Sequence, residues 1–254
     1  MKSVLLMVAF LTVNNLNGQW AFNAGQPTGI ETSSNSASGP VSIAMGFFTN
    51  AAGNGSASMG NGTSANGDNS TAMGINTVAS GYATVTMGAF NTIDFGADPS
   101  AFKMSNRALV IGNGTSSGSK SDALTILFDG TTTIAGDLTV NSDVRLKSHI
   151  QSLGNTLPLL NMLDGKSYFL KTDQSNKKIG LLAQDVLKVF PELVRKAKDP
   201  QSTLSVNYQG LIPVLINAVN EQQSMIQEYE SRFNKQQQQI DHLTTLVNQL
   251  LKKK

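Results

Sequence analysis

Ser42-Ile43-Ala44-Met45-Gly46 is the first of four similar segments, which recur every 14 residues along the chain. A second glycine follows seven residues after each segment and slips by one position, to Gly96, after the fourth. Such periodicity predicts a solenoid, in which each unit buries its face only by stacking on its neighbours. The other three segments are Ser56-Ala57-Ser58-Met59-Gly60, Ser70-Thr71-Ala72-Met73-Gly74 and Thr84-Val85-Thr86-Met87-Gly88.

A repeat of this length allows two short strands and two tight turns, with glycines supplying the positive φ angles of the turns. Ile43 and Met45 fall on one face of a strand, and the small residue between them suits close stacking. Methionine is adaptable, so we expect it to fill an irregular centre. One such coil has little core, which favours a bundle of three. A Gly/Ser/Asn/Thr-rich segment can also be a disordered linker, but the fixed Met-Gly register argues against disorder.

These repeats resemble the head repeats of trimeric autotransporter adhesins, the YadA-like head, over residues 42–96. They depart from that family in having Met where Ile or Val is usual. The resemblance implies a trimeric, left-handed parallel β-roll over residues 42–97, and it supports the architecture more than an adhesin function. Short β segments and glycine turns then predict a β stem over residues 98–141. Its strands are expected at Ala108–Gly112, Leu124–Phe128 and Thr131–Ile134, with a turn at Asp129-Gly130.

Charge marks a boundary near residue 141. Residues 1–141 carry 11 charged side chains and residues 142–254 carry 25, with net charges of −3 and +5. The total of +2 is too small and too dispersed to predict nucleic-acid binding. The chain has no cysteine, which excludes disulfides and thiolate metal sites, so oligomerisation is the expected source of stability.

At this boundary stands Ser142-Asp143-Val144-Arg145-Leu146-Lys147. Serine hydrolysis of a peptide bond needs a base for the hydroxyl proton and donors for the oxyanion. A lysine can be that base only when its amine is neutral, a state that burial favours. The spacing does not prove contact, because residues five apart lie on opposite faces of a strand and far apart around a helix. A turn, or a partner subunit, would have to bring Ser142 and Lys147 together.

The hexapeptide, followed by Ser148-His149-Ile150, resembles the entry to the endosialidase-type intramolecular chaperone, an auto-processing domain at the end of phage tailspikes. Two further blocks in the same order strengthen the resemblance over 142–254, namely Ile179–Val194 and Leu204–Leu215. The resemblance implies that Ser142 is the nucleophile and Lys147 the general base, acting once on their own chain. It implies a cut between Asn141 and Ser142 after trimer formation.

Neighbouring side chains leave alternatives open. Asp143 and Arg145 could orient the loop, although a simple ion pair within the loop is the commoner arrangement. His149 could be a second base, but a lone histidine is more often structural. No metal-ligand cluster, phosphate-binding loop or Ser-His-Asp set stands out, so we expect no cofactor and no metal.

Downstream, the pattern predicts a small α+β unit. Leu153–Leu170 reads as a helix, a glycine break and a strand, Asp173–Lys178 as a polar hairpin turn, and Ala183–Val189 as a short helix stopped by Pro191. The tail repeats in heptads, which predicts a coiled-coil helix over about 212–251 rather than a helix packed on its own domain. β-Branched residues at the first heptad position are compatible with two or three strands, and the resemblance implies a trimeric coiled coil. The heptad residues are Ile212, Val219, Ile226, Phe233, Ile240 and Val247, with Leu215, Gln222, Tyr229, Gln236, Leu243 and Leu250 three positions later.

Residues 1–18 resemble a secretory signal, with Lys2 before the apolar run Val4–Leu11, although a buried strand or helix is the alternative. The run is too short to span a bilayer, and we expect no transmembrane anchor. Residues 19–41 form an N-terminal segment of unassigned role.

The leading hypothesis is therefore a secreted or cell-surface homotrimeric fibre, mainly β in its N-terminal part, whose C-terminal domain aligns three chains and then cuts itself off. An unknown surface ligand of the head is compatible with this hypothesis. The alternatives are a structural surface adhesin with an uncleaved trimerisation domain and a prophage tail fibre. The signal-like segment speaks against the phage alternative, because phage parts assemble in the cytoplasm.

Overall fold

The computed structural model describes residues 21–22, 30–31 and 34–252 of the 254-residue chain. The predicted signal segment, residues 1–18, lies outside them, as does part of the segment 19–41. The chain forms two compact units, Met1–Asn141 and Ser142–Lys254.

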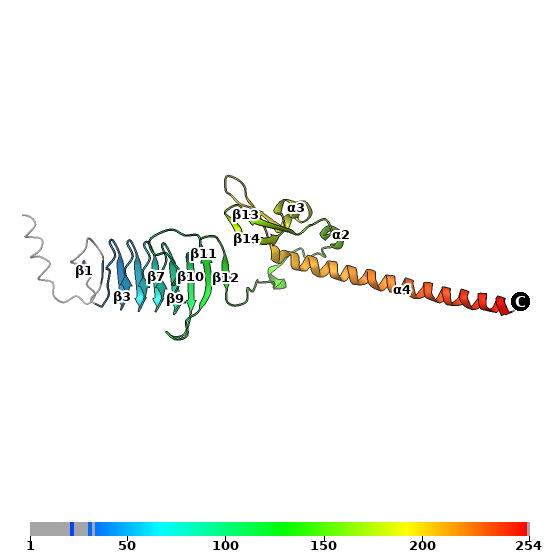
Figure 1. Cartoon of the computed structure of the whole chain (residues 1–254), viewed down its shortest axis with the longest axis horizontal. Coiled ribbons are helices and arrows are strands. Elements are labelled where there is room, and N and C mark those ends of the chain that lie inside the picture. Colours follow the sequence, from blue (N-terminus) through cyan, green and yellow to red (C-terminus); the bar gives the residue numbers. More distant parts are fainter. Residues whose placement is uncertain (1–20, 23–29, 32–33, 253–254) are drawn as a thin grey trace, which may run out of the picture. The chain divides into compact units, whose positions relative to one another are not determined.

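The N-terminal unit is built on a solenoid of parallel strands, as the period predicted (Figure 1). Each of the first three repeats supplies one long strand and one short strand, and the two kinds stack in separate sheets. The long strands are β3 (Ile43–Phe47), β5 (Ala57–Asn61), β7 (Thr71–Ile75) and β9 (Val85–Ala89). The short strands are β4 (Asn50–Ala51), β6 (Ser64–Ala65) and β8 (Val78–Ala79), and the short strands β1 (Ala21–Phe22) and β2 (Ile30–Glu31) precede them all.

Small side chains fill the interior of the solenoid. Ala44, Ser58, Ala72 and Thr86 lie opposite one another on successive long strands, and each is completely buried. Alanines face them from the short strands and are equally buried: Ala51, Ala65 and Ala79. The coil is therefore too narrow for a large apolar side chain.

The methionines lie on the outer face of the long strands and not in the centre. Met45, Met59, Met73 and Met87 are aligned in register and half-buried, and Ile111 continues their row. The expectation that methionine fills the centre is wrong for the single coil, because alternation along a strand points each Met away from the small residue before it. The outer face instead carries an apolar row.

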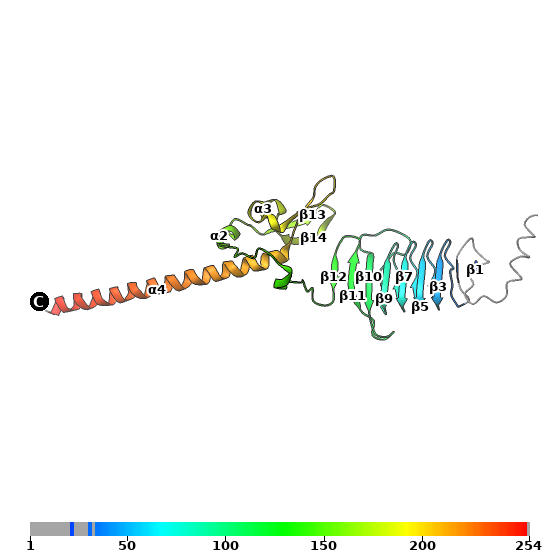
Figure 2. The same ribbon diagram turned by 180° about the vertical axis from the view of Figure 1, so that it is seen from behind.

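Three further strands extend the large sheet beyond the repeats, in the order visible in Figure 2. β10 (Arg107–Asn113) pairs in parallel with β9. β11 (Asp122–Leu127) and β12 (Thr132–Ile134) then add antiparallel neighbours. These strands agree with the three expected between residues 108 and 134, whereas residues 135–141 form no strand.

An asparagine side chain closes the short sheet at the end of the solenoid. The amide group of Asn91 accepts a hydrogen bond from the N–H of Val78 at 2.7 Å and donates one to its carbonyl at 3.0 Å. A following strand would make the same pair of bonds, and Asn91 is almost completely buried. The last rung of the stack is therefore satisfied without another repeat.

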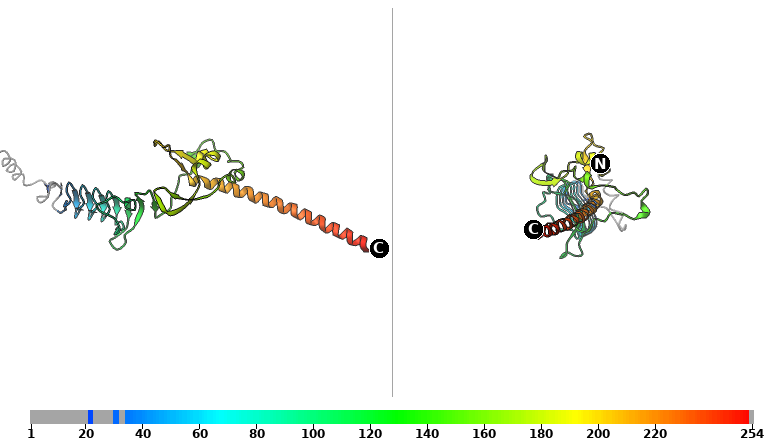
Figure 3. Two further views of the ribbon diagram at one scale, coloured as in Figure 1. Left: turned by 45° about the horizontal axis from the view of Figure 1, so that its top comes forward. Right: turned by 90° about the vertical axis from the view of Figure 1, so that its right-hand side faces the viewer.

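The C-terminal unit is a small α+β body followed by a long helix (Figure 3). Its helices are α2 (Leu157–Leu160), α3 (Ala183–Val189) and α4 (Leu211–Lys252), with 3₁₀ turns η1 (Val144–Leu146), η2 (Pro191–Leu193) and η3 (Tyr208–Gly210). Its strands form two hairpins, β13 (Lys166–Leu170) with β14 (Asp173–Gly180) and β15 (Val194–Lys196) with β16 (Leu204–Val206).

Most of these elements lie where the pattern predicted them, but the polar hairpin does not. Asp173–Lys178 was expected as a turn, whereas β14 begins at Asp173, and the turn is formed by Lys171 and Thr172. The Asp173 carboxylate accepts the N–H groups of Ser175 and Asn176. This local bonding shifts the strand register without ending the strand, so a turn-like sequence occurs within a strand.

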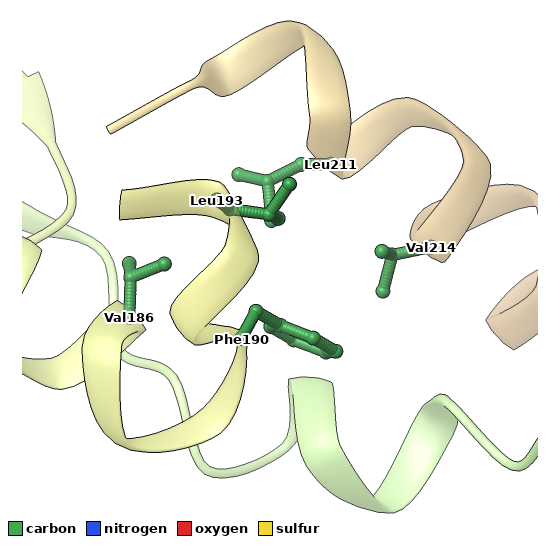
Figure 4. Packing of buried hydrophobic residues seen from close by; sticks show 5 residues of the cluster. All are labelled: Val186, Phe190, Leu193, Leu211 and Val214. Carbon is green, nitrogen blue, oxygen red and sulfur yellow. The ribbon is translucent and has the colours of Figure 1, made fainter. Parts of the chain in front are cut away.

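One apolar cluster holds the α+β body together. Five buried residues form this cluster (Figure 4). They are Val186 of α3, Phe190 directly after α3, Leu193 of η2, and Leu211 and Val214 at the start of α4. Only the first turns of α4 take part in this core, because every described residue of the helix after Glu221 is exposed in the single chain.

Candidate functional site

The hexapeptide Ser142–Lys147 begins the C-terminal unit, and the boundary between the two compact units falls between Asn141 and Ser142. All of these residues are exposed in the single chain. The residues on either side of the Asn141–Ser142 peptide bond are thus both exposed in the single chain.

A single 3₁₀ turn reverses the chain between Ser142 and Lys147. The N–H of Leu146 donates to the carbonyl of Asp143 at 3.0 Å, and the N–H of Lys147 donates to that of Val144 at 3.1 Å. The turn spans Val144–Leu146, and Lys147 returns to an extended conformation. Ser142 and Lys147 flank the turn on either side.

This turn brings the two candidate catalytic groups into contact. The Nζ of Lys147 donates a hydrogen bond to the Oγ of Ser142 at 2.6 Å. Neither a strand nor a regular helix would produce this contact at a spacing of five residues. The contact has the geometry that a nucleophile and its base require.

Asp143 and Arg145 form a second pair across the same turn. The Asp143 carboxylate accepts the N–H of Arg145 at 2.9 Å and two guanidinium contacts, Nε at 3.0 Å and a second nitrogen at 2.6 Å. The guanidinium is the first reason, and the backbone N–H the second, why the pKa of Asp143 lies below its usual value. The same contact raises the pKa of Arg145. The ion pair within the loop that the sequence suggested is therefore present, whereas the loop-orienting role stays a prediction.

His149 takes no part in this contact. Its Nδ1 lies 3.2 Å from the hydroxyl of Ser148, and its backbone has a positive φ of 53°. Within the described part of the chain, no hydrogen bond joins His149 to Ser142 or Lys147, so this arrangement gives it no role as a second base.

A carboxylate that the sequence reasoning missed fixes the segment just after the junction. Glu221 of α4 accepts the N–H of Thr156 at 2.6 Å and the N–H of Leu157 at 3.1 Å. These bonds cap the start of α2 from another helix, and the N–H of Thr156 is the first cause of the lowered pKa of Glu221. Thr156 before Leu157-Pro158 is a helix-start signal, but the partner from a distant helix could not be read from the sequence.

Residues 21–22, 30–31 and 34–252 contain neither a metal-binding cluster nor a membrane-spanning helix. No group of three or more His, Asp or Glu side chains in these ranges is arranged to hold a metal ion. The helices described there are also too short or too polar to cross a bilayer.

Comparison with protein families gives a match in the C-terminal unit. The peptidase family described as chaperone of endosialidase matches residues 142–195. The match begins at Ser142 and includes the Ser142–Lys147 turn, the first hairpin and α3.

Curated relatives are phage proteins. The chain is 33% identical over 100 residues to the long tail fiber protein Gp37 of Escherichia phage AR1, which is 37% of this chain and 9% of that protein. It is 30% identical over 104 residues to Gp37 of Enterobacteria phage K3, covering 39% and 8%. Gp37 of Salmonella phage S16 is 27% identical over 116 residues, covering 42% and 16%. The chain therefore spans only a small part of the length of each relative. The family match covers residues 142–195 and does not extend to the repeats.

Proposed function

We propose that this chain is the subunit of a homotrimeric fibre whose segment 142–254 aligns three chains and then cuts itself off between Asn141 and Ser142. The observation that carries the proposal is the 2.6 Å contact between the Lys147 amine and the Ser142 hydroxyl. It lies at the first residue of the match to the chaperone family and at the boundary between the two compact units.

In the proposed reaction, the Ser142 oxygen attacks the carbonyl carbon of Asn141 while its proton passes to the Lys147 amine. The bond between the Asn141 carbon and the Ser142 nitrogen breaks, and the proton moves on to that leaving nitrogen. An ester between Asn141 and the Ser142 oxygen results. Water then hydrolyses the ester, which leaves a carboxylate on Asn141 and a free amine and hydroxyl on Ser142.

Assembly is the step that would permit this reaction. An amine acts as a base only when it is neutral, and removal from water favours the neutral form. Lys147 and Ser142 are both exposed in the single chain. We propose that partner subunits cover the junction, so that cutting follows trimer formation and separates the fibre from the device that aligned it. Loss of that device would make the fibre kinetically stable.

Two unpartnered apolar surfaces support a trimer. The heptad residues of α4 are exposed along a helix of roughly 60 Å. Ile226, Phe233 and Leu243 are among them, with 44%, 64% and 59% of their surface accessible. The methionine row on the solenoid is the second surface. Stripes of this kind on a soluble chain indicate contact with other chains.

We infer that the fibre is a phage tail fibre. A secreted bacterial adhesin is the alternative. The curated relatives are phage long tail fiber proteins, and the YadA-like resemblance has no such support. In that setting the protein would be part of a virion outside the cell. Removal of residues 1–18 on expression in a bacterium, detected by mass spectrometry of the N-terminus, would instead support the secreted alternative.

The central experiment is expression of the full chain followed by gel electrophoresis and intact mass measurement. We expect two pieces, one ending at Asn141 and one beginning at Ser142. Ser142→Ala and Lys147→Ala should each leave the chain whole, and Lys147→Arg serves as a control that keeps the positive charge but supplies no base. A wild-type trimer that stays uncut would contradict the peptidase part and leave an uncleaved trimerisation domain.

A further inference from the structure

We propose that Asp143 is the positioning residue that holds the Lys147 amine on the Ser142 hydroxyl, and that it does so by closing the 3₁₀ turn between them. The inference rests on the proposed function, because it concerns the geometry of the same pair of residues. It assigns a task to Asp143 that an ordinary surface ion pair would not have.

The turn has three closing hydrogen bonds, and only one of them depends on a side chain. Two join backbone groups, from Leu146 to Asp143 and from Lys147 to Val144. The third runs from the N–H of Arg145 to the Asp143 carboxylate at 2.9 Å. A side-chain acceptor in this position satisfies an N–H group that a short helical turn would otherwise leave without a partner.

Packing within the C-terminal unit does not hold this turn in place. Val144 has 65% and Leu146 has 72% of its surface accessible, and no residue of η1 is buried. A 3₁₀ turn of three residues is marginal by itself. The Asp143 cap therefore contributes more to the stability of this turn than it would in a packed segment.

The arrangement gives Asp143 a positioning role and not the role of a base. Its carboxylate faces the Arg145 guanidinium and the Arg145 N–H, and both contacts keep it ionised with its oxygens engaged. The ion pair itself is exposed, and exposed pairs contribute little. The cap bond, more than the charge of Arg145, should therefore govern how often Lys147 meets Ser142.

Rates of self-cutting test this ranking in the full chain. Asp143→Ala should slow the cut about five- to tenfold, since it removes the cap. Asp143→Asn keeps an acceptor oxygen and should stay within about twofold of wild type, as should Arg145→Ala. An Asp143→Asn variant as slow as Asp143→Ala would overturn the proposal, because the charge and not the cap would then matter. So would an Arg145→Ala variant as slow as Asp143→Ala, since Arg145 would then have a direct role.

A thiol probe tests the contact without requiring a cut. The chain contains no cysteine, so Ser142→Cys introduces a single thiol, whose pKa is read from the pH dependence of its alkylation rate on uncut protein. A nearby ammonium lowers a thiol pKa, and Ser142→Cys/Lys147→Ala gives the value without it. Adding Asp143→Ala should raise the thiol pKa toward that control, because Lys147 is released.

The sign of this change separates positioning from simple electrostatics. Removal of the negative charge of Asp143 would by itself lower the thiol pKa. A fall, or no change, would therefore overturn the proposal. If the wild-type chain never cuts, the proposed function fails, while the thiol measurement still decides whether Asp143 holds the pair together.

Discussion

The two units of this chain specify their structures in opposite ways. The solenoid has an interior of Ala, Ser and Thr, and its regularity comes from backbone stacking at a fixed period. The C-terminal unit has an ordinary apolar core, in which residues far apart in the sequence, such as Val186 and Val214, belong to one buried cluster. Repetition specifies the first unit, and long-range packing specifies the second.

Both units leave apolar surface exposed, but they expose it differently. On the solenoid it is a row of methionines across successive strands. On α4 it is a heptad stripe on a helix that is exposed beyond Glu221. A coil without large core residues depends for its stability on stacking between adjacent repeats, whereas the α+β body has an apolar core of its own. The predictions below test this difference.

The largest effect is expected where the solenoid backbone is tightest. Gly60 has a φ of 126°, and a Cβ atom there would lie 2.0 Å from the carbonyl oxygen of Gly74. Gly60→Ala should therefore disrupt the stack, at a cost of about 3 kcal/mol or more, because strain and clash add together. Loss of β signal in circular dichroism and rapid proteolysis of residues 34–141 would report it.

Gly118→Ala is the matched control for this change. A Cβ atom at Gly118 would meet no other atom within 4 Å. This variant should keep the wild-type proteolysis pattern. Equal tolerance of both substitutions would contradict the backbone-stacking account of the solenoid.

The next effect concerns assembly and should leave the C-terminal core intact. Ile226→Asp together with Phe233→Asp places two charges in the predicted seam of α4, where burial in a coiled coil would be strongly unfavourable. Light scattering should then give a monomer where the wild type gives a trimer, and the cut should stop. Gln238→Asn, outside the heptad seam on the same helix, should change neither. A monomer that still cuts itself would refute the dependence of cutting on assembly.

Much of this architecture could be predicted because its signals are local or periodic. The 14-residue period predicted two strands in each repeat, which are one long and one short strand in each of the first three. The short helix expected before Pro191 is α3, Ala183–Val189. The direction of the methionines could not be predicted with the same success. The period and the alternation along a strand predicted that the methionines share one face of the strands. Whether that face points into the solenoid depends on the width of the coil. The completely buried Ala44 and Ala51 show that the coil is narrow.

A medium effect is expected in the core of the C-terminal unit. Phe190 is 5% exposed and lies between α3 and α4. Phe190→Ala should lower the free energy of unfolding by about 3 kcal/mol, through lost burial and the cavity that remains. Chemical denaturation followed by far-UV circular dichroism would measure this loss of stability. Leu187→Ala, at an exposed position of α3, should cost less than about 1 kcal/mol, and equal costs would show that the cluster is not the core.

The candidate site was only partly predictable. Residue types and the resemblance singled out Ser142 and Lys147, but their spacing could not give the contact. That contact depends on the turn closed by Asp143, and such a three-residue turn has no distinct sequence signal. The link from Glu221 to Thr156 could not be foreseen either, because it spans 65 residues. Contacts that depend on one turn or on distant packing lie beyond pattern reasoning.

The smallest effect is a pH dependence that belongs to the C-terminal unit alone. The pKa of Glu221 lies below its ordinary value of 4.5, first because the Thr156 N–H donates to it. A carboxylate with a lowered pKa in the folded state stabilises that state above its unfolded pKa, and the contribution is lost as the pH falls through the folded value. Glu221→Gln, which keeps the shape but not the charge, should therefore lower the thermal midpoint at neutral pH. The gap from wild type should narrow and close as the pH falls below 4.5 and then through the lowered folded pKa of Glu221. Asp241→Asn, at an exposed position on the same helix, controls for the loss of a negative charge from α4. A gap that persists unchanged into acid would mean that Glu221 acts through packing and not through its charge, and α2 would then be held to α4 as the rest of the body is, by apolar contact.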